Sequence, residues 1–423
     1  MRVTSGGRER ESFIPNSMLP LRANALAITD EQRVAVCGLS GVSILDGRSW
    51  HNLVFSPVKE VSGGERERGE YSADTLNIAY RVGGQTAVYD ALVSGRGELF
   101  YTVTDISALP VPDQSPEAEG PGALVRIDLG DFFDYTVYDT GAGLITGTQE
   151  LGGSPHYLKM RGIREDALGN IWALNVHTLE AKPLVLFRSD GSIRKFSREG
   201  SGDKLQILAR EMVFDSHGHL WIANEARQGD VPRTEGGITV YDPQHDVWRL
   251  LTSSDGLISN DVFSVDMDPL TGNIWAATAS GVQMIRTPSS LATAENFQLN
   301  PPLDGLSGIV PKKIRIDPRG NKWIMTQNQG IQIYLTNSTW FNQGNGLRSG
   351  NSGLPDDIVY DLVFDTREGY AYILTESGLS RYETAWTEAR TEMEVPEMIP
   401  AALQAGRETH ILSLMGWRTK PRS

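Results

Sequence analysis

The stretch from Asp317 to Trp323, DPRGNKW, decides the fold because close copies of it recur along the chain. In each copy a Gly stands three residues before an aromatic residue, as in 169–172 (GNIW), 218–221 (GHLW), 272–275 (GNIW) and, more weakly, 369–372 (GYAY). Successive aromatic residues lie 49, 54, 48 and 49 positions apart. A period of about 50 residues is typical of a four-stranded repeat unit.

The residues around each copy predict the strands of one unit. An Asp precedes the Gly by three residues at Asp166, Asp215 and Asp317, which is the first position of a type I turn between two strands. After the Trp strand comes a third strand that starts with Gly and alternates apolar with polar residues, at 237–241, 281–285, 330–334 and 378–382. A fourth strand is indicated at 246–250 and 338–341. Four antiparallel strands per unit make a propeller blade.

Two earlier segments repeat the pattern without the Trp. Residues 34–37 and 41–45 match the second and third strands of a unit, and 97–100 match the turn with Phe in the aromatic position. This gives seven units, centred near residues 35, 100, 172, 221, 275, 323 and 372. We therefore predict an all-β fold, a seven-bladed β-propeller of four-stranded antiparallel blades over residues 11–395, with polar insertions at 58–74 and 110–122.

Packing between blades explains why Trp recurs. A single blade cannot bury its apolar face, so neighbouring blades must stack around an axis. We expect the repeated Trp side chains to fill the space between blades, in equivalent buried positions. A ligand-stacking role for them is the less favoured alternative.

The ends of the chain lie outside the repeats. We expect a flexible N-terminus over 1–10 and an irregular tail over 396–423, the remnant of a further domain. The fourth strand of the last blade could come from 385–395 or from the start of the chain. Because residues 11–20 resemble the end of a blade running into the loop before a first strand, we expect 11–15 to pair with the last blade.

Composition excludes several classes of function. The chain has 423 residues and a formal net charge of -14, without a local basic patch, so we expect no binding to nucleic acid or to anionic membranes. Its one Cys excludes an internal disulfide and a Cys-based metal cluster. No stretch is apolar enough for a membrane span, and the first residues lack the apolar region of a signal peptide. We expect a monomer.

Taken together, the motif Asp-x-x-Gly-Asn-apolar-Trp, the strand Gly-apolar-x-apolar-Tyr and a loop such as 253–261 resemble the two-component-regulator propeller repeat. The resemblance covers at least 160–385 and is weaker over 25–160. This family includes sensory propellers of hybrid histidine kinases and PorZ-type proteins associated with type IX secretion. It implies an extracytoplasmic protein, periplasmic or at the cell surface, that binds a glycan or another protein, is not catalytic and needs no cofactor.

An enzyme is the alternative to a binding protein. The virginiamycin B lyase group resembles this chain in its turn pattern and uses a His and a Glu at the mouth of a seven-bladed propeller. We cannot place that pair here, and the chain has no nucleophile elbow, P-loop or metalloprotease motif. We therefore predict no catalytic residues.

Two clusters invite a metal hypothesis. His217 and His219 could present two imidazoles to a metal, joined by His177 or His156 from the neighbouring blade. The same two positions are ordinary turn positions in the other repeats, and we favour that interpretation and predict no metal site. Asp266 and Asp268 resemble the start of a calcium loop, but Pro269 and the absence of further ligands favour a turn.

Loop length gives the prediction for the binding site. The loops between second and third strands, and those that join one blade to the next, emerge on one face. Most of the extra length lies there, at 55–86, 105–122, 140–156, 175–182 and 224–236, whereas 287–296 falls on the other face. We predict that a glycan or protein ligand binds this face. The candidate ligand-binding residues are His177, Lys182, Glu225, Arg227, Asp230, Arg233, Arg348 and Asp356. A purely solvated loop at 224–236 is the alternative.

Overall fold

The computed structural model describes the repeats and short parts of the N-terminal and C-terminal regions. The described residues are 2–5, 8–11, 23–29, 33–38, 41–46, 49–57, 75–80, 86–105, 123–130, 134–138, 158–176, 178, 180–227, 234–294, 296–366, 369–384 and 399–402. The expected insertions at 58–74 and 110–122 fall outside these residues. A strand begins at Thr75, directly after the first insertion.

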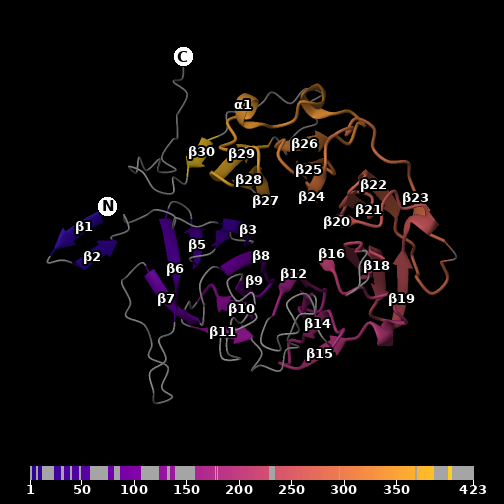
Figure 1. Cartoon of the computed structure of the whole chain (residues 1–423), viewed down its shortest axis with the longest axis horizontal. Coiled ribbons are helices and arrows are strands. Elements are labelled where there is room, and N and C mark those ends of the chain that lie inside the picture. Colours follow the sequence, from indigo (N-terminus) through magenta and orange to yellow (C-terminus); the bar gives the residue numbers. More distant parts are fainter. Residues whose placement is uncertain are drawn as a thin grey trace, which may run out of the picture.

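Seven sheets follow one another around an axis, one per predicted blade (Figure 1). The first three blades contain the strands β3 (Ala23–Ile28), β4 (Val34–Gly38), β5 (Gly41–Asp46), β6 (Ser49–Pro57) and β7 (Thr75–Tyr80); β8 (Thr86–Val93), β9 (Glu98–Asp105), β10 (Ala123–Asp128) and β11 (Tyr135–Tyr138); and β12 (Met160–Glu165), β13 (Ile171–Asn175), β14 (Leu184–Phe187) and β15 (Ile193–Phe196).

The other four blades contain β16 (Ala209–Phe214), β17 (Leu220–Asn224), β18 (Gly237–Asp242) and β19 (Val247–Leu251); β20 (Val262–Met267), β21 (Ile274–Thr278), β22 (Gly281–Arg286) and β23 (Gln298–Leu299); β24 (Pro311–Ile316), β25 (Lys322–Thr326) and β26 (Ile331–Tyr334); and β27 (Val359–Asp365), β28 (Tyr370–Thr375), β29 (Gly378–Glu383) and β30 (Ile399–Ala402). Helical structure is limited to η3 (Glu199–Ser201), η4 (Ser253–Asp255), η5 (Phe341–Gly344) and α1 (Ser349–Ser352) among the described residues. The predicted all-β, seven-bladed propeller is confirmed.

The first strand of each blade lies nearest the axis (Figure 1). Each contacts the first strand of the next blade, and β27 contacts β3, which closes the ring. Each of these seven strands has one extra residue relative to the second strand that it pairs with, for example between Ala209 and Glu211 in β16. A bulge of this kind bends a strand and redirects its side chains.

The recurring turn places Trp between blades. Gly320 has a φ of 77°, a left-handed conformation that Gly adopts without steric cost, and this explains the fixed Gly of the motif. Trp323 follows on β25, is 1% exposed, and donates its indole N–H to Asp317 Oδ2 at 2.9 Å. Its ring packs against Phe364 and Tyr382 of the next blade. Trp172, Trp221 and Trp275 are buried in the same way, as predicted.

Two blades depart from the expected four-stranded pattern. In the first, β7 adds a fifth strand parallel to β6, within a segment we expected to be a loop. In the sixth, the expected fourth strand at 338–341 is reduced to one bridge between Tyr334 and Trp340.

The seventh blade corrects our expectation about the N-terminus. Its fourth strand is β30, from the segment we expected to be an irregular tail, and it pairs with β29. Glu11, expected to pair with this blade, lies in β2 (Arg8–Glu11), which pairs with β1 (Arg2–Ser5). Residues 12–15 are outside the described part of the chain. Pro400 argued against a strand in the sequence. An edge strand nevertheless tolerates Pro, because the positions on its outer side need no N–H group for pairing.

None of the described helices is both long and apolar enough to cross a membrane.

Candidate functional site

Charged side chains from the first strands meet at the axis and form a layer that we call the axial layer, made of Asp90, Arg164, Glu211, Ser264, Asp266, Lys313, Arg315 and Asp361. Glu211 in the fourth blade binds Arg164 in the third at 3.1 Å and Arg315 in the sixth. The fourth and sixth blades are not neighbours, so this contact spans the interior of the ring. Ser264 of the fifth blade also donates its hydroxyl to Glu211.

The surrounding cations keep Glu211 ionised. Burial raises the pKa of its carboxyl group, but the charges of Arg315, Lys313 and Arg164 more than offset this and lower it to about 2. Asp266 shows the opposite balance, since burial raises its pKa despite the nearby Arg315.

The other carboxylates of the axial layer fasten one blade to the next. Asp90 accepts the backbone N–H of Ile163 at 2.8 Å, and Asp266 accepts that of Ile316 at 2.7 Å. Asp361 accepts the N–H of Leu26 at 3.0 Å, which joins the last blade to the first, and forms an ion pair with Lys313 at 2.6 Å. The charged groups of the axial layer thus pair with one another and with backbone N–H groups. The axial layer therefore has a structural role.

A second group of side chains lies at one end of the axial layer, where the first strands begin and the second strands end. We call it the mouth cluster, and it consists of Tyr89, Arg161, Arg210, Glu225, Phe263 and Lys312. Glu225 comes directly after β17, and its backbone N–H bonds Leu208 O just before β16. This end of the ring carries the loops between second and third strands, which is the face predicted to bind a ligand.

Glu225 holds two arginines together. Its Oε1 lies 3.1 Å from Arg161 Nη1 and also forms an ion pair with Arg210 Nε. Burial alone would raise the pKa of Glu225, but the two guanidinium groups outweigh burial and hold it below its usual range. Glu225 is therefore an anion at neutral pH and a poor proton donor.

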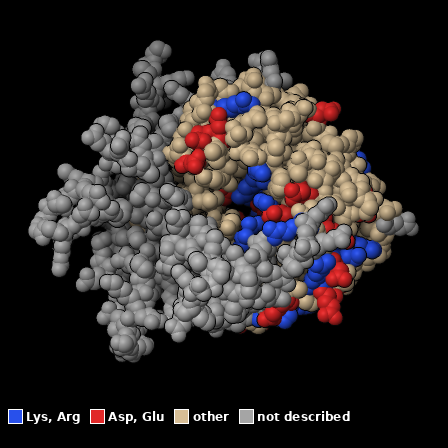
Figure 2. All heavy atoms as spheres, viewed as in Figure 1, with Lys and Arg blue, Asp and Glu red and all other residues tan. Residues whose placement is uncertain are grey.

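Aromatic rings support the cations of the mouth cluster. Arg161 Cζ lies 4.9 Å from the centre of the Tyr89 ring. Arg210 Cζ and Lys312 Nζ lie 5.1 Å and 4.5 Å from the centre of the Phe263 ring. Cations at such distances are attracted by the ring electrons and are held in place. Figure 2 shows Lys and Arg atoms gathered near the axis, with Asp and Glu atoms beside them, on the face in view.

Of the sequence-predicted residues, Glu225 belongs to the mouth cluster. Arg227 lies two residues further on and forms a backbone bridge with Thr234. Lys182 is exposed and forms an ion pair with Glu180 at 3.1 Å. These two lie in loops of the predicted face.

The remaining predicted residues lie outside the mouth cluster or outside the described residues. Arg348 donates to Gln329 at 3.2 Å, and Asp356 accepts from Ile358 N and from Ser377, all close to where the sixth blade leads into the seventh. His177, Asp230 and Arg233 are outside the described residues. The ligand-binding role of all eight residues stays a prediction.

Sequence analysis missed Arg161, Arg210 and Lys312. Each stands near the beginning of a first strand, two residues before a buried apolar residue, which is Ile163, Met212 or Ile314. A polar residue at that place in several repeats was the available signal. This recurring polar residue could not show which blades face each other across the axis.

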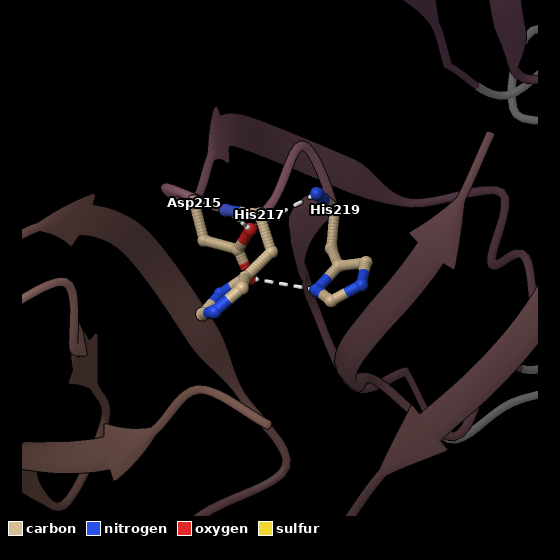
Figure 3. A group of neighbouring side chains, drawn as sticks. All are labelled: Asp215, His217 and His219. Atoms are coloured by element: carbon tan, nitrogen blue, oxygen red, sulfur yellow. Dashed lines mark hydrogen bonds and ion pairs between the residues drawn. The ribbon is translucent and has the colours of Figure 1, made fainter. Parts of the chain in front are cut away.

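The histidine pair forms part of a turn (Figure 3). Asp215 Oδ1 accepts the backbone N–H groups of His217 and His219, and its Oδ2 accepts His219 Nδ1 and Trp221 Nε1, both at 2.9 Å. In the sixth blade Asn321 Nδ2 donates to Asp317 Oδ2 in the same way, at 2.9 Å. His219 thus replaces the Asn of the motif.

A metal would compete with this turn. Ligand atoms of Asp215, His217 and His219 do lie within 4.8 Å of one another. However, both oxygens of Asp215 already accept two hydrogen bonds each, and Nδ1 of His219 serves as a donor. Burial would raise the pKa of Asp215, but the bonds from His219 and Trp221 lower it overall. The geometry favours the turn interpretation.

Comparison with known proteins identifies relatives by fold alone. No protein-family model matches the chain. No curated protein matches it either. Among solved structures, the extracellular domain of a hybrid two-component system from B. thetaiotaomicron superposes with a TM-score of 0.50 at 12% identity, over 84% of this chain and 38% of that one.

Two further structures are similar. Virginiamycin B lyase from Staphylococcus aureus has a TM-score of 0.52 at 11% identity, over 86% of this chain and 94% of that one. PorZ, a surface component of the type-IX secretion system of Porphyromonas gingivalis, has a TM-score of 0.46 at 12% identity, over 90% of this chain and 77% of that one.

The resemblance to two-component-regulator propellers is thus confirmed at the level of fold. The chain spans 38% of the length of the extracellular domain that it matches. Since the same fold occurs in a sensor domain and in a lyase, the fold does not decide between binding and catalysis.

Proposed function

We propose that this chain is a non-catalytic binding propeller that receives its ligand at the mouth cluster, on the face with the long loops. The observation that carries this proposal is the contrast between the two charged groups at the axis. The axial layer is closed by mutual pairing, whereas the mouth cluster keeps Arg210 and Lys312 partly exposed, at the end of a rigid scaffold. Binding sites favour such convergent polar groups on a preformed surface.

The biological setting is part of the same proposal. We propose an extracytoplasmic sensor domain or a surface scaffold associated with secretion, periplasmic or at the cell surface, with a glycan or a protein as ligand. The support is the resemblance of the repeat motif to two-component-regulator propellers.

A lyase is the second candidate, favoured by the superposition with virginiamycin B lyase over nearly the whole of that enzyme. Its chemistry needs a general base or acid at the mouth. Among the described residues, the histidines are His51 on β6, His217 and His219 in a turn at the opposite end, and His245 in another turn. Glu225 is held as an anion by two arginines. These observations favour binding over catalysis.

A glycan array with the intact protein tests the proposal. The wild type is compared with the double variant Arg210→Gln/Lys312→Gln and with the control Arg188→Gln/Arg286→Gln, whose exposed side chains lie at the opposite end of the blades. We expect glycan signals that the mouth variant loses and the control keeps. Signals that survive in the mouth variant would overturn this placement, and metal-dependent cleavage of a streptogramin B substrate would establish the lyase.

A further inference from the structure

The charge of the mouth cluster indicates what it binds. The mouth cluster has three cations, Arg161, Arg210 and Lys312, and the carboxylate of Glu225 pairs directly with the first two. Asp261 lies nearby, but it bonds the backbone of Ala226, and burial raises its pKa. Even when Asp261 is counted as ionised, the site keeps a positive excess in a chain with a formal net charge of -14.

Several N–H groups of the mouth cluster have no acceptor among the described residues. Glu225 engages Nη1 of Arg161 and Nε of Arg210. No acceptor within the described chain pairs with the terminal nitrogens of Arg210 or with Nζ of Lys312, and the buried Nε of Arg161 is also unbonded. Arg210 and Lys312 come from the blades on either side of Phe263 and both border its ring, so each offers free donors at this end of the axis.

The form of the site favours a small acidic group over a flat protein surface. The side chains of Arg161 and Arg210 are 16% and 35% exposed, so Arg161 is largely buried and Arg210 is half-buried at the axis. A guanidinium group and an ammonium group bind carboxylate or sulfate through charge-assisted hydrogen bonds. A recessed site admits a projecting sugar substituent more easily than a folded protein face.

We infer that the mouth cluster is an anion-binding site that recognises the acidic group of a saccharide, a carboxylate or a sulfate, with Arg210 and Lys312 as its charged anchors. This inference rests on the proposed function and names its ligand class. Arg161 is held in place by Glu225 and Tyr89 and supplies the third positive charge.

Glu225 competes with the ligand in this arrangement. Its carboxylate occupies Nη1 of Arg161 and Nε of Arg210, and its negative charge repels a second anion, so neutralising it removes this repulsion. The Glu225→Gln variant should therefore bind an acidic saccharide more tightly than the wild type. A site that merely needed Glu225 for its structure would instead lose affinity.

Isothermal titration with defined probes tests the inference. The probes are trigalacturonate, a glucuronate disaccharide and a sulfated chondroitin disaccharide, each against its neutral counterpart, with an acidic peptide as a separate arm. We expect at least one acidic saccharide to bind about tenfold or more tighter than its neutral form, with affinity that falls as salt rises. Arg210→Gln and Lys312→Gln should each weaken this binding by about tenfold.

The controls separate this inference from the proposed function. Arg210→Lys keeps the charge and should retain most of the preference, and Arg188→Gln/Arg286→Gln should change nothing. Thermal melting confirms that each variant is folded. Neutral saccharides that bind as well as acidic ones, and lose binding in the mouth variants, would overturn the anion inference and keep the proposed function. Binding of the acidic peptide alone, or of no acidic saccharide, would also overturn it.

Discussion

Glu211 shows at the scale of one residue how the axial layer is stabilised. Removing its charge leaves Arg164 and Arg315 close together without their shared carboxylate. Loss of one partner from a buried ion pair destabilises a protein by about 3 to 5 kcal/mol. We expect this loss in the free energy of unfolding of Glu211→Gln, measured by urea denaturation.

Asp266 provides the matched control. It lies in the same layer, but its pKa is raised because burial disfavours its charge. An amide can still accept the N–H of Ile316, so Asp266→Asn should change the free energy of unfolding by about 1 kcal/mol or less. Equal losses in the free energy of unfolding of Glu211→Gln and Asp266→Asn would contradict the different environments of the two carboxyl groups.

The same two residues predict opposite effects of acid. The pKa of Glu211 is lowered in the folded protein from 4.5 to about 2, so its stabilising contribution is complete above pH 4.5 and is lost as the pH falls toward 2. The raised pKa of Asp266 means that protonation relieves a penalty as the pH falls. Denaturation between pH 5 and 2 should show a shallower loss of stability for Glu211→Gln, and a steeper one for Asp266→Asn, than for the wild type. Parallel curves would contradict this assignment.

At the scale of elements, the turn and its Trp strand form the repeating part of the fold. Trp323→Ala removes a buried ring that contacts the next blade and should lower the free energy of unfolding by about 3 to 5 kcal/mol. Trp323→Phe keeps most of the packing but loses the indole bond to Asp317, and should lower it by about 1 to 2 kcal/mol. Thermal melting ranks the two variants. A phenylalanine variant as unstable as the alanine variant would show that packing is not the main contribution.

The same elements show what the sequence could and could not predict. The second strands were predictable because the turn chemistry and the Trp are local, and all seven were located, from Val34–Gly38 to Tyr370–Thr375. β7 and β30 carry no such local signal, since their pairing depends on a neighbouring strand. For the candidate site, the sequence predicted a face and Glu225, but not Arg161, Arg210 or Lys312. Arg315 and Glu211 lie 104 positions apart in sequence, and only closure of the ring brings them together.

Ring closure governs stability at the scale of the whole molecule. The first and last blades meet where Asp361 bonds the backbone of Leu26, and β30 completes the last blade. β1 and β2, in contrast, pair with each other. Truncation before residue 396 should therefore lower the thermal midpoint by several degrees, and more than deletion of residues 1–11. The reverse ranking in thermal melts would contradict the pairing of β30.

A crystal structure of the protein with a saccharide selected on the array tests the central claim most directly. The account predicts a ligand at the axis, on the face with the long loops, with an acidic group within hydrogen-bond distance of Arg210 or Lys312. A ligand bound on the opposite face, near Asp215 and the other turns between first and second strands, or on the outer edge of a blade, would contradict it.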